Sequence, residues 1–159
     1  MLVAAGVVLT VVAVFALGLF VRAPRMRHKP LTPEKLQSLL RTLLTYGRPG
    51  ALLLIQVRKQ PSFVQFRIDA SGRKKGLQAG FPRAPWSEAV FERVLEDLGG
   101  RGIPVRRQPE PGPQVTEFAL GDFGSDIEAA QEHASTVLRD ILRADPEREC
   151  YAVLEGDFD

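Results

Sequence analysis

The first 21 residues, Met1 to Val21, carry no charged side chain, and Thr10 is the only polar residue among them. At about 1.5 Å of rise per residue, a helix of this length spans roughly 30 Å, the thickness of the hydrocarbon core of a bilayer. A helix on the surface of a soluble domain keeps one polar face, whereas this segment is apolar on all sides. The sequence therefore predicts a transmembrane helix over residues 1–21.

A cleaved signal peptide is the alternative interpretation of this segment. Signal peptides begin with a basic region, continue with a shorter apolar run of about 7–15 residues and end in small residues of the A-x-A type. Here no basic side chain precedes the apolar run, the run is longer, and no A-x-A pattern follows it. These three features favour a retained anchor.

A basic segment follows the apolar run and predicts its orientation. Arg22, Arg25, Arg27 and Lys29 all lie directly after Val21. Lys and Arg next to a membrane span remain on the cytoplasmic side. We therefore expect a single-pass protein of the inner or plasma membrane, with its N-terminus outside, a basic juxtamembrane linker at 22–31 and residues 32–159 in the cytoplasm. The same cations attract anionic lipid headgroups, by about 1 kcal/mol each, so membrane lipid is an expected partner.

The charge of the remaining chain argues against nucleic acid as a partner. The whole chain has 21 basic and 19 acidic residues, for a net charge of +2. Four of the basic residues precede Pro30, which leaves 17 basic against 19 acidic residues and a net charge of −2. A nucleic-acid-binding domain is clearly basic. Cys150 is the only cysteine; an intramolecular disulfide is therefore impossible, which suits a reducing compartment.

Hydrophobic periodicity predicts one α+β domain over residues 32–159. Thr32 is an expected N-cap, with Pro33 at the first helical position and a leucine stripe that ends at Gly47. Short turns then separate three apolar or alternating segments, which predicts an antiparallel meander. The expected strands are Leu52–Arg58, Ser62–Asp69 with Val64, Phe66 and Ile68 on one face, and a weaker third strand with Leu77, Ala79 and Phe81.

The second half of the domain repeats the helix and hairpin patterns. A helix is expected from Ser87 to Leu98, closed by Gly99-Gly100, and a last helix is expected to begin at a capping box formed by Ser125 and Glu128. Residues 103–108 and 115–120 read as a hairpin, and Cys150–Leu154 as a short strand or packed tail. The predicted order is α-βββ-α-ββ-α, with an antiparallel sheet covered by helices.

This order and three local motifs resemble a known superfamily. The motifs are Phe63-Val64-Gln65-Phe66, the Leu98-Gly99 helix end, and the segment 138–142 (LRDIL) before Asp145-Pro146. Over Thr32 to Leu154 the chain resembles the type III secretion chaperone-like superfamily, in particular its YbjN/TY-Chap branch. The resemblance implies an α+β sandwich, frequent homodimers and binding of protein segments without catalysis. It also suggests self-association through the middle helix, whose charged face carries Glu88, Glu92, Arg93, Glu96 and Asp97. The membrane anchor departs from the family, whose members are usually soluble.

The residues that could carry chemistry are few, and we expect no catalytic, cofactor or metal site. His28 and His133 are interpreted as solvated surface histidines, because a metal site needs several converging ligands. Cys150 has no histidine placed to activate it and is interpreted as a half-buried structural thiol. Asp122, Asp126 and Glu128 lie near a helix start, where acidic residues are ordinary capping and dipole partners.

The basic residues of the meander are the remaining surface feature. We expect the Lys59 turn and the Arg73–Lys75 turn at opposite ends of the sheet, so that Arg58, Lys59, Arg67, Arg73, Lys74 and Lys75 form no single patch. They are interpreted as a solvated, aggregation-resistant edge. The alternative is that one basic hairpin tip contacts anionic lipid or an acidic partner.

These observations together predict a membrane-anchored, non-catalytic protein-binding module, either chaperone-like or an accessory subunit, at the cytoplasmic face of the membrane. Its expected partner is another protein: a membrane-complex subunit, a client segment, or a second copy of the chain in a homodimer. The alternatives are a single-span structural subunit of a larger membrane complex or an enzyme with an unrecognised site. An acid–base pair within one pocket would favour the enzyme, and the sequence offers no strong candidate for such a pair.

Overall fold

A computed structural model describes residues 26–159 of the chain. The predicted transmembrane helix at 1–21 lies outside the described residues, as do Arg22 and Arg25. Across the described range, every helix is too short or too polar to cross a bilayer.

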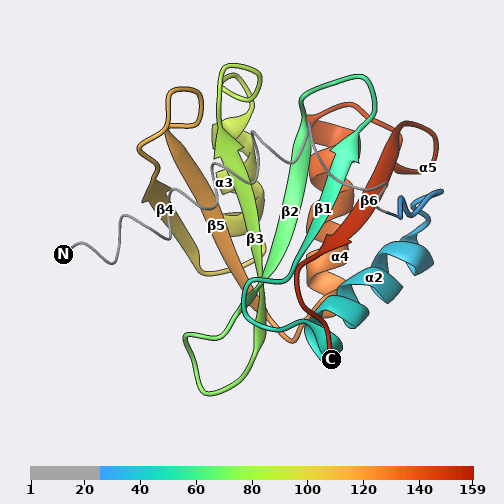
Figure 1. Cartoon of the computed structure of the whole chain (residues 1–159). Helices are drawn as coiled ribbons and strands as arrows, with labels where there is room; N and C mark the ends of the chain where they lie inside the picture. Colours follow the sequence, from blue (N-terminus) through green and yellow to red (C-terminus); the bar gives the residue numbers. More distant parts are fainter. Residues whose placement is uncertain (1–25) are drawn as a thin grey trace.

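One six-stranded antiparallel sheet forms the centre of the domain (Figure 1). Its strand order is β4-β5-β3-β2-β1-β6, so the last strand pairs with the first and the second hairpin joins the meander through β5 and β3. The strands are β1 (Leu52–Val57), β2 (Phe63–Asp69), β3 (Gly76–Arg83), β4 (Val105–Pro109), β5 (Glu117–Gly124) and β6 (Cys150–Glu155).

The helices pack on one face of this sheet (Figure 1). They are α2 (Pro33–Tyr46), α3 (Phe91–Gly100), α4 (Ile127–Thr136), which continues as a π-helical turn η1 (Val137–Ile141), and the short α5 (Pro146–Glu149). The predicted α+β class and the order α-βββ-α-ββ-α are confirmed, with α5 and β6 added at the C-terminal end.

Residues between the sheet and the helices form the hydrophobic core. Phe66, Phe81 and Phe91 are its largest side chains, each at most 2% exposed. Val64, Phe66 and Ile68 all point into it, as the alternation in β2 predicts. Burying each of these large apolar side chains contributes about 1.5–3 kcal/mol, which makes this layer the main source of the fold's stability.

Local capping signals agree with the structure at the first helix and differ at the next two. The Thr32 Oγ1 accepts a hydrogen bond from the Lys35 N–H (3.1 Å), and the Gly47 N–H ends α2 on the Leu43 carbonyl (2.9 Å). The predicted helix start at Ser87 is wrong, because α3 begins at Phe91. The buried Ser87 hydroxyl instead closes the preceding turn, accepting from the Ala84 N–H (2.8 Å) and donating to the Pro82 carbonyl (2.6 Å).

The predicted end of the helix before Gly99-Gly100 and the predicted capping box at Ser125 are also wrong. Both glycines lie inside α3, and the chain turns only at Gly102, whose φ is +70°. At the start of α4, the N-cap is Asp126, whose carboxylate accepts from the Ala129 N–H (2.9 Å). A carboxylate at this position also meets the positive end of the helix dipole, which a serine hydroxyl does not match.

The C-terminal part of the predicted linker packs on the domain. Leu31 is 1% exposed and belongs to the core. His28 forms an isolated antiparallel bridge with Ala152 at the free edge of β6, with N–O distances of 2.8 and 3.0 Å. The chain therefore enters the domain along the β6 edge of the sheet.

Candidate functional site

The second face of the sheet is the candidate binding surface. Within residues 26–159 no helix lies over it; in Figure 1, α3 and α4 lie behind the sheet, and α2 and α5 lie beside its β6 edge. Because side chains alternate along a strand, this face receives every residue that does not point into the core. We call it the helix-free face, and its main residues are Leu52, Leu54, Gln56, Phe63, Gln65, Arg67, Gln78, Gly80, Phe118, Leu120, Asp122, Tyr151, Val153 and Glu155.

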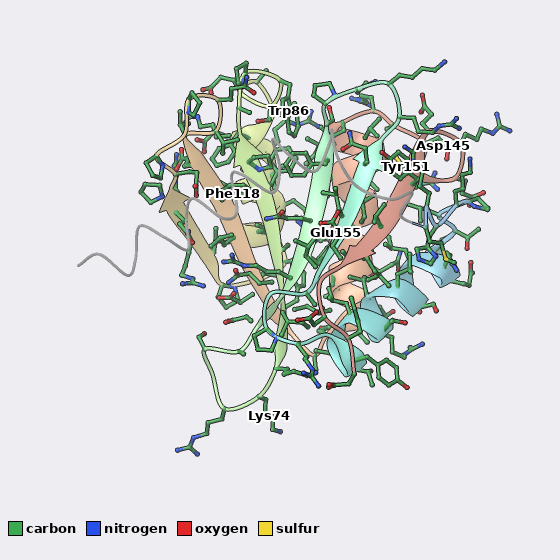
Figure 2. All side chains as sticks on the ribbon, viewed as in Figure 1. Lys74, Trp86, Phe118, Asp145, Tyr151 and Glu155 are labelled. Carbon is green, nitrogen blue, oxygen red and sulfur yellow. The ribbon has the colours of Figure 1, made fainter. Side chains whose placement is uncertain are left out.

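Much of the helix-free face is apolar. Phe118, Leu120 and Val153 are buried, with exposed fractions of 6%, 3% and 7%, yet they do not belong to the hydrophobic core cluster on the helix side. Leu52 and Leu54 in β1 are half-buried. Figure 2 labels Phe118 on β5 and Tyr151 and Glu155 on β6, at the two sides of this face. A sheet surface that faces water is normally polar, so this face is more apolar than usual, and Leu52 and Leu54 are its partly accessible apolar residues.

A line of hydrogen bonds crosses the face between β2 and β4. The Arg67 Nε donates to the Gln78 Oε1 (2.6 Å), and the Gln78 Nε2 donates to the Asp122 Oδ1 (2.7 Å). Arg106 lies 3.8 Å from the second oxygen of Asp122. Burial lowers the pKa of the Arg67 guanidinium, against the opposing effect of Asp69. The polar groups of this line satisfy one another and fix the positions of the side chains around them.

Gln65 is the exception to this satisfied pattern. Its side chain lies over Gly80, where an added Cβ would come within 2.8 Å of the Gln65 Nε2, so a larger residue at position 80 would displace the amide. Gln65 is 5% exposed, and its Oε1 is buried with no hydrogen-bond partner among the described residues. A buried amide oxygen without a partner costs about 1–3 kcal/mol.

The structure describes two of the four residues of the predicted basic flank, Arg27 and Lys29. Arg22 and Arg25 lie outside the described residues. The Arg27 guanidinium lies over the Tyr151 ring, 4.5 Å from its centroid, which is cation–π geometry. Lys29 is exposed. Their roles in topology and lipid contact stay a prediction.

The prediction of a solvated His133 is wrong. Its side chain is 1% exposed and stacks near Phe123, with ring centroids 5.4 Å apart. The His133 Nδ1 lies 2.6 Å from the Asp97 Oδ2, which also accepts from the Arg101 Nε (2.9 Å). Burial favours a raised pKa for Asp97, but hydrogen bonds from His133 and Arg101 outweigh it and hold the pKa below its ordinary value.

A signal for this buried histidine exists in the sequence. His133 stands next to Ala134 and three residues after Ala130, and both alanines lie on the core stripe of α4. Small residues on that stripe leave room for an imidazole to turn inward. Its partner could not be predicted, because Asp97 lies 36 residues earlier and the two helices meet only in the folded protein. The pair connects α3 to α4.

The remaining reactive groups are also held in the core or at its edge. Cys150 is 1% exposed, more buried than predicted, and burial raises the pKa of its thiol to about 11, so the thiol is protonated at neutral pH. Burial, with a smaller contribution from Lys35, lowers the pKa of His28. Within the described residues, no group of three or more His, Cys, Asp or Glu side chains could hold a metal ion.

The basic turns lie at opposite ends of the sheet, as predicted. Lys59 is in the β1–β2 turn, while Lys74 lies in the β2–β3 loop at the other end, where Figure 2 labels it. The neighbouring Lys75 donates to the Gly47 carbonyl (2.8 Å) and so fastens this loop to the end of α2.

The charged face before and along α3 is largely paired within the chain. Glu88 contacts Arg83 (2.6 Å), and Glu92 lies 3.7 Å from Arg107. These pairs satisfy side chains that the resemblance assigns to self-association. The homodimer stays a prediction.

Comparisons of the chain with protein-family models, with curated proteins and with solved structures found no match. The resemblance to the chaperone-like superfamily therefore stays a prediction, and the functional argument rests on the sheet and its surface.

Proposed function

We propose that the chain is a single-pass membrane protein whose cytoplasmic domain binds another protein through the helix-free face, without catalysis. The observation that carries the binding function is the composition of that face. It combines partly accessible apolar side chains, Leu52 and Leu54, with polar side chains that hydrogen bonds hold in place, such as Arg67. An apolar surface with a few fixed polar groups is typical of sites that receive a protein segment.

The anchored state is supported by the sequence of the N-terminal segment. Residues 1–21 are uncharged and long enough to span a bilayer, and the cations at Arg22, Arg25, Arg27 and Lys29 follow directly. The bridge between His28 and Ala152 ties the segment closely to the sheet. A tether this short restricts the partners of the domain to proteins at the membrane surface, such as a subunit of a membrane complex or a client segment.

Photo-crosslinking in cells tests the binding function. A photoreactive amino acid at position 54, on the helix-free face, should give an adduct with another protein. The matched control is position 96, which is exposed on α3 behind the sheet. The substitution Leu54→Arg should abolish copurification of the adduct protein, because it places a charge in an apolar contact. Equal crosslinking at both positions, or adducts with lipid alone, would contradict the proposal.

The topology has its own test. A reporter fused after Asp159 should be active only if it works in the cytoplasm, because the basic flank follows the apolar segment. A C-terminal fusion that is active outside, or a mature chain that begins near residue 22, would overturn the anchored state.

A further inference from the structure

We propose that the Arg67 guanidinium on the helix-free face receives a carboxylate from the partner, and that this carboxylate belongs to a protein segment with an apolar residue within two positions of it. The apolar residue contacts the accessible parts of Leu52 and Leu54. This inference rests on the proposed function and names the chemistry of the segment that the face binds.

Hydrogen bonds orient the Arg67 side chain but use only one of its nitrogens. The Arg67 Nε donates to the Gln78 Oε1 (2.6 Å), and the Gln78 Nε2 donates in turn to Asp122 (2.7 Å). A guanidinium presents its N–H groups in a rigid planar fork. Among residues 26–159, no hydrogen-bond partner accepts from the Nη1 or Nη2 of Arg67. These terminal nitrogens are therefore held in a fixed direction and are available to an incoming acceptor.

The charge of Arg67 also lacks an ion-pair partner within the described residues. Asp69 and Asp122 act on this charge from a distance, but Asp69 accepts from the Ser71 N–H (3.0 Å) and Asp122 lies beside Arg106 (3.8 Å). Burial lowers the pKa of the half-buried Arg67 guanidinium against the opposing effects of both carboxylates, and Arg106 lowers it further. A charge that loses water is stabilised by an opposite charge. A carboxylate from the partner supplies that counter-charge.

The accessible apolar residues of the face lie next to this guanidinium. Leu52 is the cross-strand neighbour of Arg67, and Leu54 is the cross-strand neighbour of Gln65. Side chains directly opposite on antiparallel strands are about 5 Å apart, and diagonal ones such as Arg67 and Leu54 are about 7–8 Å apart. In an extended segment, side chains two residues apart lie on the same side at about 7 Å. An acidic and an apolar residue at this spacing can therefore contact Arg67 and Leu54 together.

A protein carboxylate matches this arrangement better than a lipid phosphate does. The carboxylate is planar and pairs with a guanidinium through two parallel hydrogen bonds. A lipid phosphate also binds arginine, but the acyl chains of the lipid leave from its glycerol and not from beside the phosphate. Leu52, in contrast, lies directly opposite Arg67. The occupant is therefore an acidic protein segment.

Peptide selection by the full chain tests this chemistry. The chain is purified in phosphatidylcholine nanodiscs, and a display library of random short peptides is selected against it. Peptides that still bind the Leu54→Arg variant are rejected, so the remaining ones require the helix-free face. These peptides should contain Asp or Glu within two positions of an apolar residue. Replacing that acid by its amide in the peptide, which leaves the protein intact, should weaken binding at least about tenfold.

Substitutions in the chain connect the acid to its expected partner. Arg67→Gln should weaken binding by a similar factor, and in this variant the change from acid to amide in the peptide should have little further effect. Arg67→Lys keeps the charge without the planar fork and should give a smaller loss. Arg73→Gln is the matched control, because Arg73 is exposed in the β2–β3 loop, and it should leave the affinity unchanged.

Four results would overturn the inference: no peptide specific for the face, selected peptides without an acidic residue, equal affinity for Arg67→Gln and the native chain, or loss of the peptide when phosphatidylglycerol is added to the nanodiscs. The last result would assign Arg67 to lipid headgroups. Face-specific peptides that lack an acid, or that ignore Arg67→Gln, would leave the proposed binding function standing. That function is judged by the crosslink at position 54 in cells, and a failed crosslink would leave the peptide result standing.

Discussion

Removing the Asp97 carboxylate tests the interpretation that its pair with His133 stabilises the packing of α3 on α4. Asp97→Ala removes the acceptor of a 2.6 Å contact to a histidine that is 1% exposed, and of a 2.9 Å bond from Arg101. A buried donor that loses its partner costs about 1–3 kcal/mol. The partly exposed Arg101 pair adds only about 0.3–0.5 kcal/mol. We therefore expect a loss of about 2–3 kcal/mol in the free energy of unfolding.

Urea unfolding of the full chain in a mild detergent, followed by the fluorescence of Trp86, measures this loss. Trp86 is the only tryptophan and packs on Phe63 and Phe81, with ring centroids 5.6 Å apart in both pairs, so it reports on tertiary structure. With a denaturant dependence of about 1.5 kcal/mol per molar urea, the midpoint should fall by about 1–2 M. Glu96→Ala, one residue earlier and exposed, should change stability by less than about 0.5 kcal/mol. Equal midpoints for the two variants would refute the reasoning.

The pH dependence of the stability tests the contribution of Asp97 independently. The pKa of Asp97 lies below its ordinary value of 3.8 in the folded protein. Its contribution to stability is therefore present above pH 3.8 and is lost as the pH falls through the folded pKa. Asp97→Asn cannot ionise, so the difference between the native chain and this variant should shrink in that acidic range. A difference that grows toward acid would contradict the direction of the pKa shift.

Two further substitutions test the core and the sheet. Phe66→Ala should lower the free energy of unfolding by about 3–5 kcal/mol in the same urea assay, because Phe66 is 0% exposed beneath the helices. A loss below about 1 kcal/mol would contradict the assignment of Phe66 to the core face of β2. Gly121→Ala should destabilise the protein by about 1–3 kcal/mol, because the new Cβ would lie 2.6 Å from the Leu98 Cδ2. Gly99→Ala meets no atom within 4 Å inside α3 and should stabilise it by up to about 1 kcal/mol, so equal effects at the two glycines would contradict the packing of α3 on β5.

Local patterns in the sequence were sufficient to predict most of the helices and strands. Thr32 and Gly47 delimit the first helix, and the alternation of Val64, Phe66 and Ile68 assigns the core face of β2. These signals act between residues a few positions apart, so they are readable without the rest of the chain. Helix starts were less reliable. Ser87 and Ser125 offer the same hydroxyl as a cap, and only their surroundings decided that one closes a turn and the other yields to Asp126.

The candidate surface depended on contacts between distant parts of the chain. The sequence by itself determined the uncharged segment, the strand alternation and the residues available to each face. Only the tertiary structure decided that β5 pairs with β3, that β6 pairs with β1, and that the helices gather on one side of the sheet. It also turned His133 inward to meet Asp97. Such pairings follow from the packing of the whole chain, because any strand edge can form hydrogen bonds with another and burial selects the arrangement in which the apolar faces meet.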